Sequence, residues 1–171
     1  MNNTPSVQSK SLHPYGSLQL LSLVVLRLLI GWHFLYEGFA KVFNANWTAA
    51  GFLLDSKWIF SKIFVFMAED PTILTIVNFS NKWGLIFIGL GLMTGTLTRI
   101  SSLAGIFLLG LYYFATPPFI GYTYSVPMEG SYLIVNKNMI EAMALLVLIL
   151  FPTGHIIGLD RLIFVKKSVK Q

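Results

Sequence analysis

The sequence predicts an all-α integral membrane protein, a four-helix bundle that folds as a single domain over residues 1–171. Two observations carry this prediction. Hydrophobic residues make up 55% of the chain and charged residues only 11%, a composition typical of membrane proteins. The apolar residues also gather in four stretches, each close to the length that crosses a hydrocarbon core of about 30 Å. No linker or charge block divides these stretches, so we expect one domain.

The first predicted span covers residues 18–39, and ionisable side chains lie along it and just beyond it: Arg27, His33, Glu37 and Lys41. An arginine at the bilayer centre costs at least ~2.5 kcal/mol, so such groups face a bundle interior, pair with one another or line a site. At about 100° per residue, His33, Glu37 and Lys41 share one face of the helix. Their spacing of four residues allows Glu37 to bridge the other two.

Between Trp47 and Met67 the chain is amphipathic and rich in aromatic residues, which is typical of a segment lying in the membrane interface. A re-entrant cap over the bundle is the alternative, since non-helical backbone at membrane depth must be covered by protein. Asp70 followed by Pro71 then predicts the start of a helix, because aspartate caps helices and proline suits their first position.

The second and third predicted spans cover residues 83–98 and 100–116. They are short and nearly contiguous, which predicts a tight helical hairpin with Arg99 at its tip. Glycines dot this hairpin, and Gly91 and Gly95 form a GxxxG pattern. Small residues let membrane helices approach closely. Packing within the bundle is favoured over a dedicated dimer face, because GxxxG alone is a weak pattern.

The fourth predicted span covers residues 139–157, with Pro152 close to its end. Its first turn brings Asn138 and Glu141 to the depth of the polar residues at the end of the first span. A shared pocket between the two helices is the functional interpretation. The structural alternative is a water-exposed Glu141 paired with Lys137.

An even number of spans places both termini on one side of the membrane. The hairpin tip lies on that side too, together with basic residues of the tails: Lys10, Arg161, Lys166, Lys167 and Lys170. The positive-inside rule makes this side cytoplasmic, so the segment between the first two spans is extracytoplasmic.

Several function classes are excluded by composition. The chain has no cysteine, which rules out thiolate catalysis and cysteine-ligated iron–sulfur clusters. The net charge of +5 comes from dispersed lysines and arginines, so no nucleic-acid surface is expected. His13, His33 and His155 lie at different levels, so no haem is expected, and no metal or nucleotide motif is present. Redox chemistry would therefore depend on a bound ligand.

Three motifs in order resemble the DoxX family of small four-helix membrane proteins. They are RLLIGWHFLYEGFAK, GLIFIGLGLMTGTLTR and GHIIGLDRL, and the resemblance runs from about Leu18 to Arg161. Carried over by position, the signature residues would be Arg27, Gly31, Gly38, Lys41, Arg99, Gly158, Leu159 and Asp160. Glu37 departs from the family pattern, which suggests a subgroup with its own substrate.

The resemblance implies a multi-pass protein of the bacterial inner membrane, related to the membrane subunit of thiosulfate:quinone oxidoreductase. We expect a quinone-linked oxidoreductase subunit whose polar pocket, between the first and fourth helices, takes a quinone or a small anionic substrate. Glu37, Glu141 and His33 are the candidate catalytic residues for proton relay and hydrogen bonding. Arg27, Lys41 and Asn138 are the candidate substrate-binding residues, with Arg27 and His33 also facing the quinone.

Two of these residues also have a structural interpretation. Arg27 would equally lock the bundle by hydrogen-bonding backbone carbonyls, and His33 would equally be a satisfied interior histidine. Two rival functions also remain open: a small-solute or proton transporter, and a non-catalytic assembly or anchor subunit. We expect contact with the lipid bilayer and with either a partner subunit or further copies of the chain.

Overall fold

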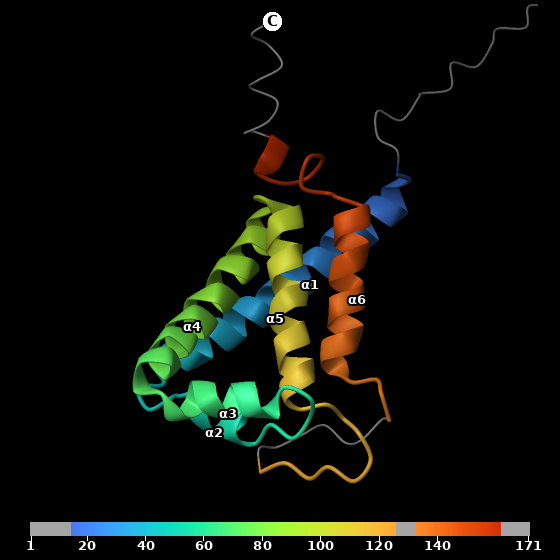
Figure 1. Ribbon diagram of the computed structural model, residues 1–171. Coiled ribbons are helices and arrows are strands. Elements are labelled where there is room, and N and C mark those ends of the chain that lie inside the picture. Colours follow the sequence, from blue (N-terminus) through green and yellow to red (C-terminus); the bar gives the residue numbers. More distant parts are fainter. Residues whose placement is uncertain (1–14, 126–132, 162–171) are drawn as a thin grey trace, which may run out of the picture.

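The computed structural model describes residues 15–125 and 133–161, and over these ranges it is built from helices without strands (Figure 1). The helices are α1 (Ser17–Phe43), α2 (Ala50–Leu54), α3 (Ser61–Glu69), α4 (Pro71–Thr94), α5 (Thr98–Ala115) and α6 (Lys137–Leu150). The orientation prediction relies partly on Lys10, Lys166, Lys167 and Lys170, which lie outside the described residues, as does His13.

Three of the helices, α1, α4 and α5, are long and apolar enough to cross a membrane. The predicted spans at residues 18–39 and 100–116 agree with α1 and α5 to within a few residues. The predicted span at 83–98 covers the second half of α4, which begins at Pro71 and ends at Thr94. Asp70 caps it as expected, with its carboxylate accepting hydrogen bonds from the backbone N–H groups of Thr72 and Ile73.

The fourth predicted span, residues 139–157, is wrong at its far end. Helix α6 has 14 residues and stops at Leu150. Pro152 lacks an N–H group and forces the preceding residue, Phe151, out of the helical region of backbone angles, so the chain turns there. At 1.5 Å per residue α6 is about 21 Å long, less than the ~30 Å core. A fourth complete crossing and the sidedness of the termini thus stay predictions.

The four longer helices pack as two pairs. Helix α1 lies along α4, and α5 lies antiparallel to α6, with α4 also contacting α5 (Figure 1). A buried hydrophobic core joins the pairs: Ile30, Phe34, Leu85, Ile88, Leu92, Leu109, Leu145 and Leu148. The short helices α2 and α3 lie across one end of the bundle, which we call the cavity end. The opposite end holds the α4–α5 turn and residues 151–161, and we call it the hairpin end.

Glycines set the close approach of α1 and α4. A Cβ atom added to Gly89 would lie 2.6 Å from the backbone nitrogen of Leu35 and 2.8 Å from the carbonyl oxygen of Gly31. One added to Gly38 would lie 2.7 Å from the side chain of Ile86. These are distances that real Cβ atoms do not adopt, so the two backbones touch only because these positions lack side chains.

The hairpin turn lies a few residues earlier than predicted. Gly95, at φ 70°, ends α4 in the left-handed conformation, and Leu97 at φ 49° precedes α5. Arg99 is therefore not the tip itself but an exposed residue in the first turn of α5. Asp160 closes this turn: its carboxylate accepts hydrogen bonds from Leu97 N at 2.8 Å and from the Thr98 hydroxyl at 3.1 Å.

Helices α2 and α3 are fastened to the bundle at several points. The backbone nitrogen of Ala49 donates to the side-chain oxygen of Asn78 at 2.8 Å. The Trp58 ring stacks on Phe114 with centroids 5.6 Å apart. The buried carboxylate of Asp55 accepts a hydrogen bond from the Ser125 backbone at 2.5 Å. The segment predicted at residues 47–67 thus forms an ordered cap over the cavity end.

Candidate functional site

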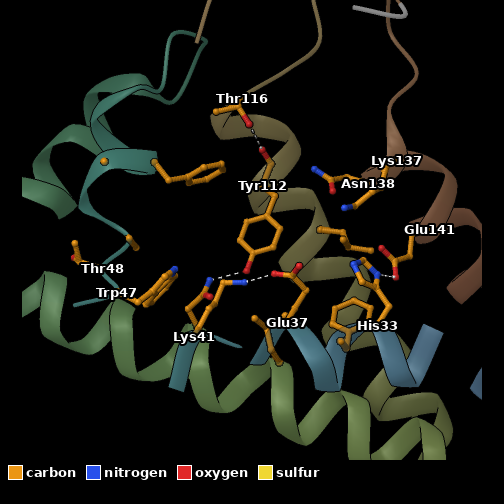
Figure 2. A pocket seen from close by; sticks show the side chains of 17 residues that line it. His33, Glu37, Lys41, Trp47, Thr48, Tyr112, Thr116, Lys137, Asn138 and Glu141 are labelled. Atoms are coloured by element: carbon orange, nitrogen blue, oxygen red, sulfur yellow. Dashed lines mark hydrogen bonds and ion pairs between the residues drawn. The ribbon is translucent and has the colours of Figure 1, made fainter. Parts of the chain in front are cut away.

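A cavity of about 500 Å³ lies at the cavity end, between α1, α5 and α6 and beside the cap (Figure 2). We call it the polar cavity. Five of the six candidate residues from the sequence line it: His33, Glu37, Lys41, Asn138 and Glu141. Helix α1 supplies three of them from one face, because residues four apart lie on successive turns. Helix α6 supplies the other two from its first turn. This arrangement is consistent with the prediction that two helices bring these groups to one level.

Two charged pairs line the polar cavity, one within α1 and the other between α1 and α6. The amino group of Lys41 lies 2.6 Å from a carboxylate oxygen of Glu37, the pairing that the spacing along α1 predicts. His33 does not join this pair. Its Nδ1 lies 2.7 Å from a carboxylate oxygen of Glu141, on α6. Glu37 therefore pairs with one of its two expected neighbours, while the imidazole connects α1 to α6.

Glu141 is the more deeply placed carboxylate. Its side chain is 10% exposed, whereas that of Glu37 is 44% exposed. One oxygen faces His33, and the other, Oε2, has no hydrogen-bond partner among the described residues. A buried oxygen without a partner costs about 1–3 kcal/mol, so this carboxylate retains unused capacity to accept a hydrogen bond.

Trp47 also lines the polar cavity, and two lysines lie near its ring. The amino groups of Lys41 and Lys82 lie 5.7 Å and 5.3 Å from the centroid of the Trp47 ring. Cations at such distances are attracted to the electron-rich face of an indole. Trp47 is the first residue of the cap, so these contacts hold the start of the cap against α1 and α4.

Two lining residues were not predicted from the sequence, Asn81 and Tyr112, which form the wall between α4 and α5. The Asn81 amide donates a hydrogen bond to the Tyr112 hydroxyl at 2.7 Å. The amide oxygen of Asn81 is buried without a hydrogen-bond partner among the described residues. Asn81 was not predicted to line a site because the second span was predicted to begin at residue 83. The helix start at Asp70 was the available signal, since a helix from there includes Asn81.

Arg27 lies apart from the other candidates, at the hairpin end. Its side chain is 2% exposed, and one guanidinium nitrogen donates to the Thr153 hydroxyl at 3.0 Å. Asp160 is close enough to act on it electrostatically. The neighbouring backbone is also tight, because a Cβ on Gly95 would lie 3.1 Å from the guanidinium. The structure thus brings Arg27 together with the turn at residues 151–161, and not with the polar cavity.

The groups lining the polar cavity favour binding and proton transfer. Among residues 15–125 and 133–161, no three histidine, aspartate or glutamate side chains gather so that they would hold a metal ion. The cavity instead offers two ammonium groups, an imidazole, two carboxylates, two amides and a phenol, with apolar walls from Phe34, Leu85 and Leu109. Such a site suits a planar organic ligand with polar substituents.

The DoxX family model matches residues 22–117, from the first turns of α1 to just beyond the end of α5. No significant similarity was found to a curated protein or to a solved structure. The match leaves out α6 and the closing GHIIGLDRL motif, so it is shorter than the resemblance expected from Leu18 to Arg161. Since it nevertheless covers more than half of the sequence and includes the three helices that are long enough to cross a membrane, the chain belongs to the DoxX family.

Proposed function

We propose that the polar cavity binds the ring of a quinone and exchanges protons with it, as the membrane subunit of a quinone-linked oxidoreductase in the bacterial inner membrane. The observation that carries the proposal is the arrangement of His33 and Glu141 on one side of the cavity and Lys41 and Glu37 on another. The cavity volume of about 500 Å³ lies within the usual range for small-ligand sites, about 300–1,000 Å³.

The lining residues would divide the work of holding the ring. Phe34, Leu85 and Leu109 offer apolar faces for the plane of the ring, and the polar groups lie around them. Lys41 would attract a negatively charged ring oxygen, and the Asn138 amide would hydrogen-bond to the ring. The Tyr112 hydroxyl, which already accepts a hydrogen bond from Asn81, keeps its own proton available for donation.

A quinone that becomes a quinol takes up two electrons and two protons. The His33–Glu141 pair would serve the proton part of this exchange, because a hydrogen-bonded imidazole and carboxylate pass a proton between them over 2.7 Å. Glu37, which is less buried than Glu141, would connect the cavity to water. The chain has no cysteine to hold an iron–sulfur cluster, so electrons would come from the substrate or from a partner's cofactor.

The experiment is to purify the protein in mild detergent and measure bound quinone by mass spectrometry. We expect the wild type to retain quinone above the level of the co-purified lipid background. Glu141→Gln keeps the shape of the side chain but removes its charge, so it should lower the bound fraction about tenfold or more, as expected for a lost charge-assisted hydrogen bond of about 1.5–3 kcal/mol.

Glu69→Gln is the matched control, because Glu69 is an exposed carboxylate at the end of α3 and does not line the polar cavity. It should retain quinone as the wild type does. A wild-type protein that is folded and carries no quinone above background would contradict the proposal and favour a transport or assembly role. Equal retention by Glu141→Gln and Glu69→Gln would remove Glu141 from the site.

A further inference from the structure

A second cavity, of about 450 Å³, adjoins the first. It lies between α4 and α5, beneath α2 and α3, and we call it the apolar cavity. Four residues line both cavities: Ala49, Phe52, Asn81 and Tyr112. The rings of Phe52 and Tyr112 meet edge to face with centroids 5.7 Å apart. The two cavities therefore meet along a boundary formed by the cap, α4 and α5.

The chemistry changes sharply across this boundary. The polar cavity contains two lysines, two glutamates and a histidine. The apolar cavity has no charged residue in its lining, and its polar side chains are Ser80, Asn81 and Tyr112. Its remaining walls are aliphatic and aromatic, with Leu53, Phe64 and Ile88 among them. Such a wall offers a hydrocarbon chain many contacts and a polar group almost none.

The apolar cavity also reaches the outer surface of two helices that are long enough to cross a membrane. Ile76 on α4 and Phe107 on α5 line it, and they are 61% and 68% exposed. In a bilayer these side chains face the acyl chains, because apolar residues exposed on a spanning helix contact lipid. A hydrocarbon chain can thus extend from the apolar cavity into the membrane without crossing water.

We infer that the ligand of this protein carries a long hydrocarbon tail, whose first part lies in the apolar cavity while its ring lies in the polar cavity. The inference rests on the proposed function and adds that the substrate is membrane-borne, an isoprenoid quinone instead of a water-soluble one. The ligand enters from the bilayer between α4 and α5, and its tail passes the rings of Phe52 and Tyr112.

Three glycines allow a clean test, because a Cβ atom added to any of them meets nothing within 4 Å. Gly84 lines the apolar cavity, Gly51 lines the polar cavity, and Gly110 lines neither. Leucine at Gly84 or Gly51 would fill the adjoining cavity without pushing backbones apart. Gly84 and Gly110 both lie inside spanning helices, so Gly110→Leu is the control for the change in helix propensity.

The probes are a tail-less dimethoxy-methylbenzoquinone and the same ring carrying a decyl tail, titrated into each purified variant in the same detergent. Each buried methylene tightens binding about fourfold, and detergent competes for the tail, so we expect the tailed probe to bind the wild type about tenfold more tightly than the tail-less one. Gly84→Leu should abolish that advantage and leave the affinity of the tail-less probe unchanged. Gly110→Leu should behave as the wild type, and Gly51→Leu should weaken both probes.

The outcomes separate the two proposals. If the tail-less ring binds the wild type but Gly84→Leu and Gly110→Leu show the same advantage for the tail, the tail does not lie in the apolar cavity and the inference is overturned, while the proposed function stands. If neither probe binds the folded wild type, the proposed function fails and the inference fails with it. A tail advantage lost only in Gly84→Leu supports the inference.

Discussion

Arg27 is a buried charged residue whose contacts join separate parts of the protein. It is buried at the hairpin end, where it donates to Thr153 and lies near Asp160. Asp160 in turn holds the α4–α5 turn through Leu97 and Thr98. These contacts join the middle of α1 to the turn after α6. Arg27 and Asp160 therefore stabilise the same end of the bundle, the hairpin end.

We predict that Arg27→Ala destabilises the protein by about 1–3 kcal/mol, because Thr153 and Asp160 lose a buried partner. The measurement is thermal unfolding in detergent. Arg99→Ala is the control, since Arg99 is exposed at the same end of the bundle and should change stability little. An Arg27→Ala protein as stable as Arg99→Ala, but unable to bind quinone, would instead give Arg27 the binding role considered from the sequence.

Individual contacts could be predicted from the sequence only within one helix. The pairing of Lys41 with Glu37 follows from helical spacing, and it is present at 2.6 Å. The pairing of His33 with Glu141 and the bond between Asn81 and Tyr112 join different helices. Such contacts depend on which helices are neighbours and on their rotation, and neither is encoded in the spacing along one element.

At the scale of elements, the α1–α4 pair depends on Gly89. We predict that Gly89→Ala destabilises the protein by about 1–3 kcal/mol, because the new methyl group would meet the backbone of Leu35 and Gly31. Gly110→Ala is the matched control, since its Cβ meets nothing within 4 Å. Alanine there should stabilise its helix by about 0.5–1 kcal/mol. The measurement is the unfolding of both variants in detergent, in which Gly89→Ala should be less stable and Gly110→Ala more stable than the wild type. Equal stabilities of the two variants would refute the close contact.

Tyr124 lies in the segment after α5, where its hydroxyl donates to the Pro117 carbonyl at 2.7 Å, and the amino group of Lys57 in the cap lies 5.3 Å from the centroid of its ring. Burial, with smaller contributions from Tyr122 and Asp55, raises the pKa of Tyr124 to about 12. The ordinary value is about 10, so the folded protein holds this proton more tightly than the unfolded chain. The contribution of Tyr124 to stability is therefore complete below pH ~10 and is lost as the pH rises towards 12.

This pH dependence is checked by titrating phenolate absorbance in the wild type and in Tyr124→Phe. The difference between the two curves should contain one tyrosine that ionises near pH 12. A difference centred on pH ~10 would mean that Tyr124 is not buried in the folded protein.

Element boundaries were predictable where a residue has a strong local effect. Asp70 and Pro71 start α4 as the sequence indicates, and Pro152 marks the end of α6. Hydropathy alone was a poorer guide. It began the second span at residue 83, although α4 begins at Pro71, about three turns earlier. The polar residues Asn78 and Asn81 interrupt the apolar pattern there, because they bond to the cap and to α5.

For the whole molecule, composition and the order of apolar stretches were sufficient to predict an all-α membrane protein, and the resemblance of three motifs was sufficient to predict the DoxX family. The polar cavity could be anticipated because charged groups inside a spanning helix need an enclosed side. The apolar cavity could not, since its lining residues are mostly ordinary apolar residues of the cap, α4 and α5, which come together only in the folded protein.

The short α6 gives the molecule an uneven hydrophobic thickness. Helix α1 offers about 40 Å of length and α6 about 21 Å. If α6 crosses the membrane, as the sequence predicts, the bilayer beside it would thin, or the exposed apolar side chains of Phe151, Ile157 and Leu159 would enter the hydrocarbon to complete the crossing. The backbone of Leu159 already bonds to the carbonyl oxygen of Thr94, so this turn carries part of its hydrogen bonding with it. Such a wedge would tilt the protein and favour thinner or curved regions of membrane.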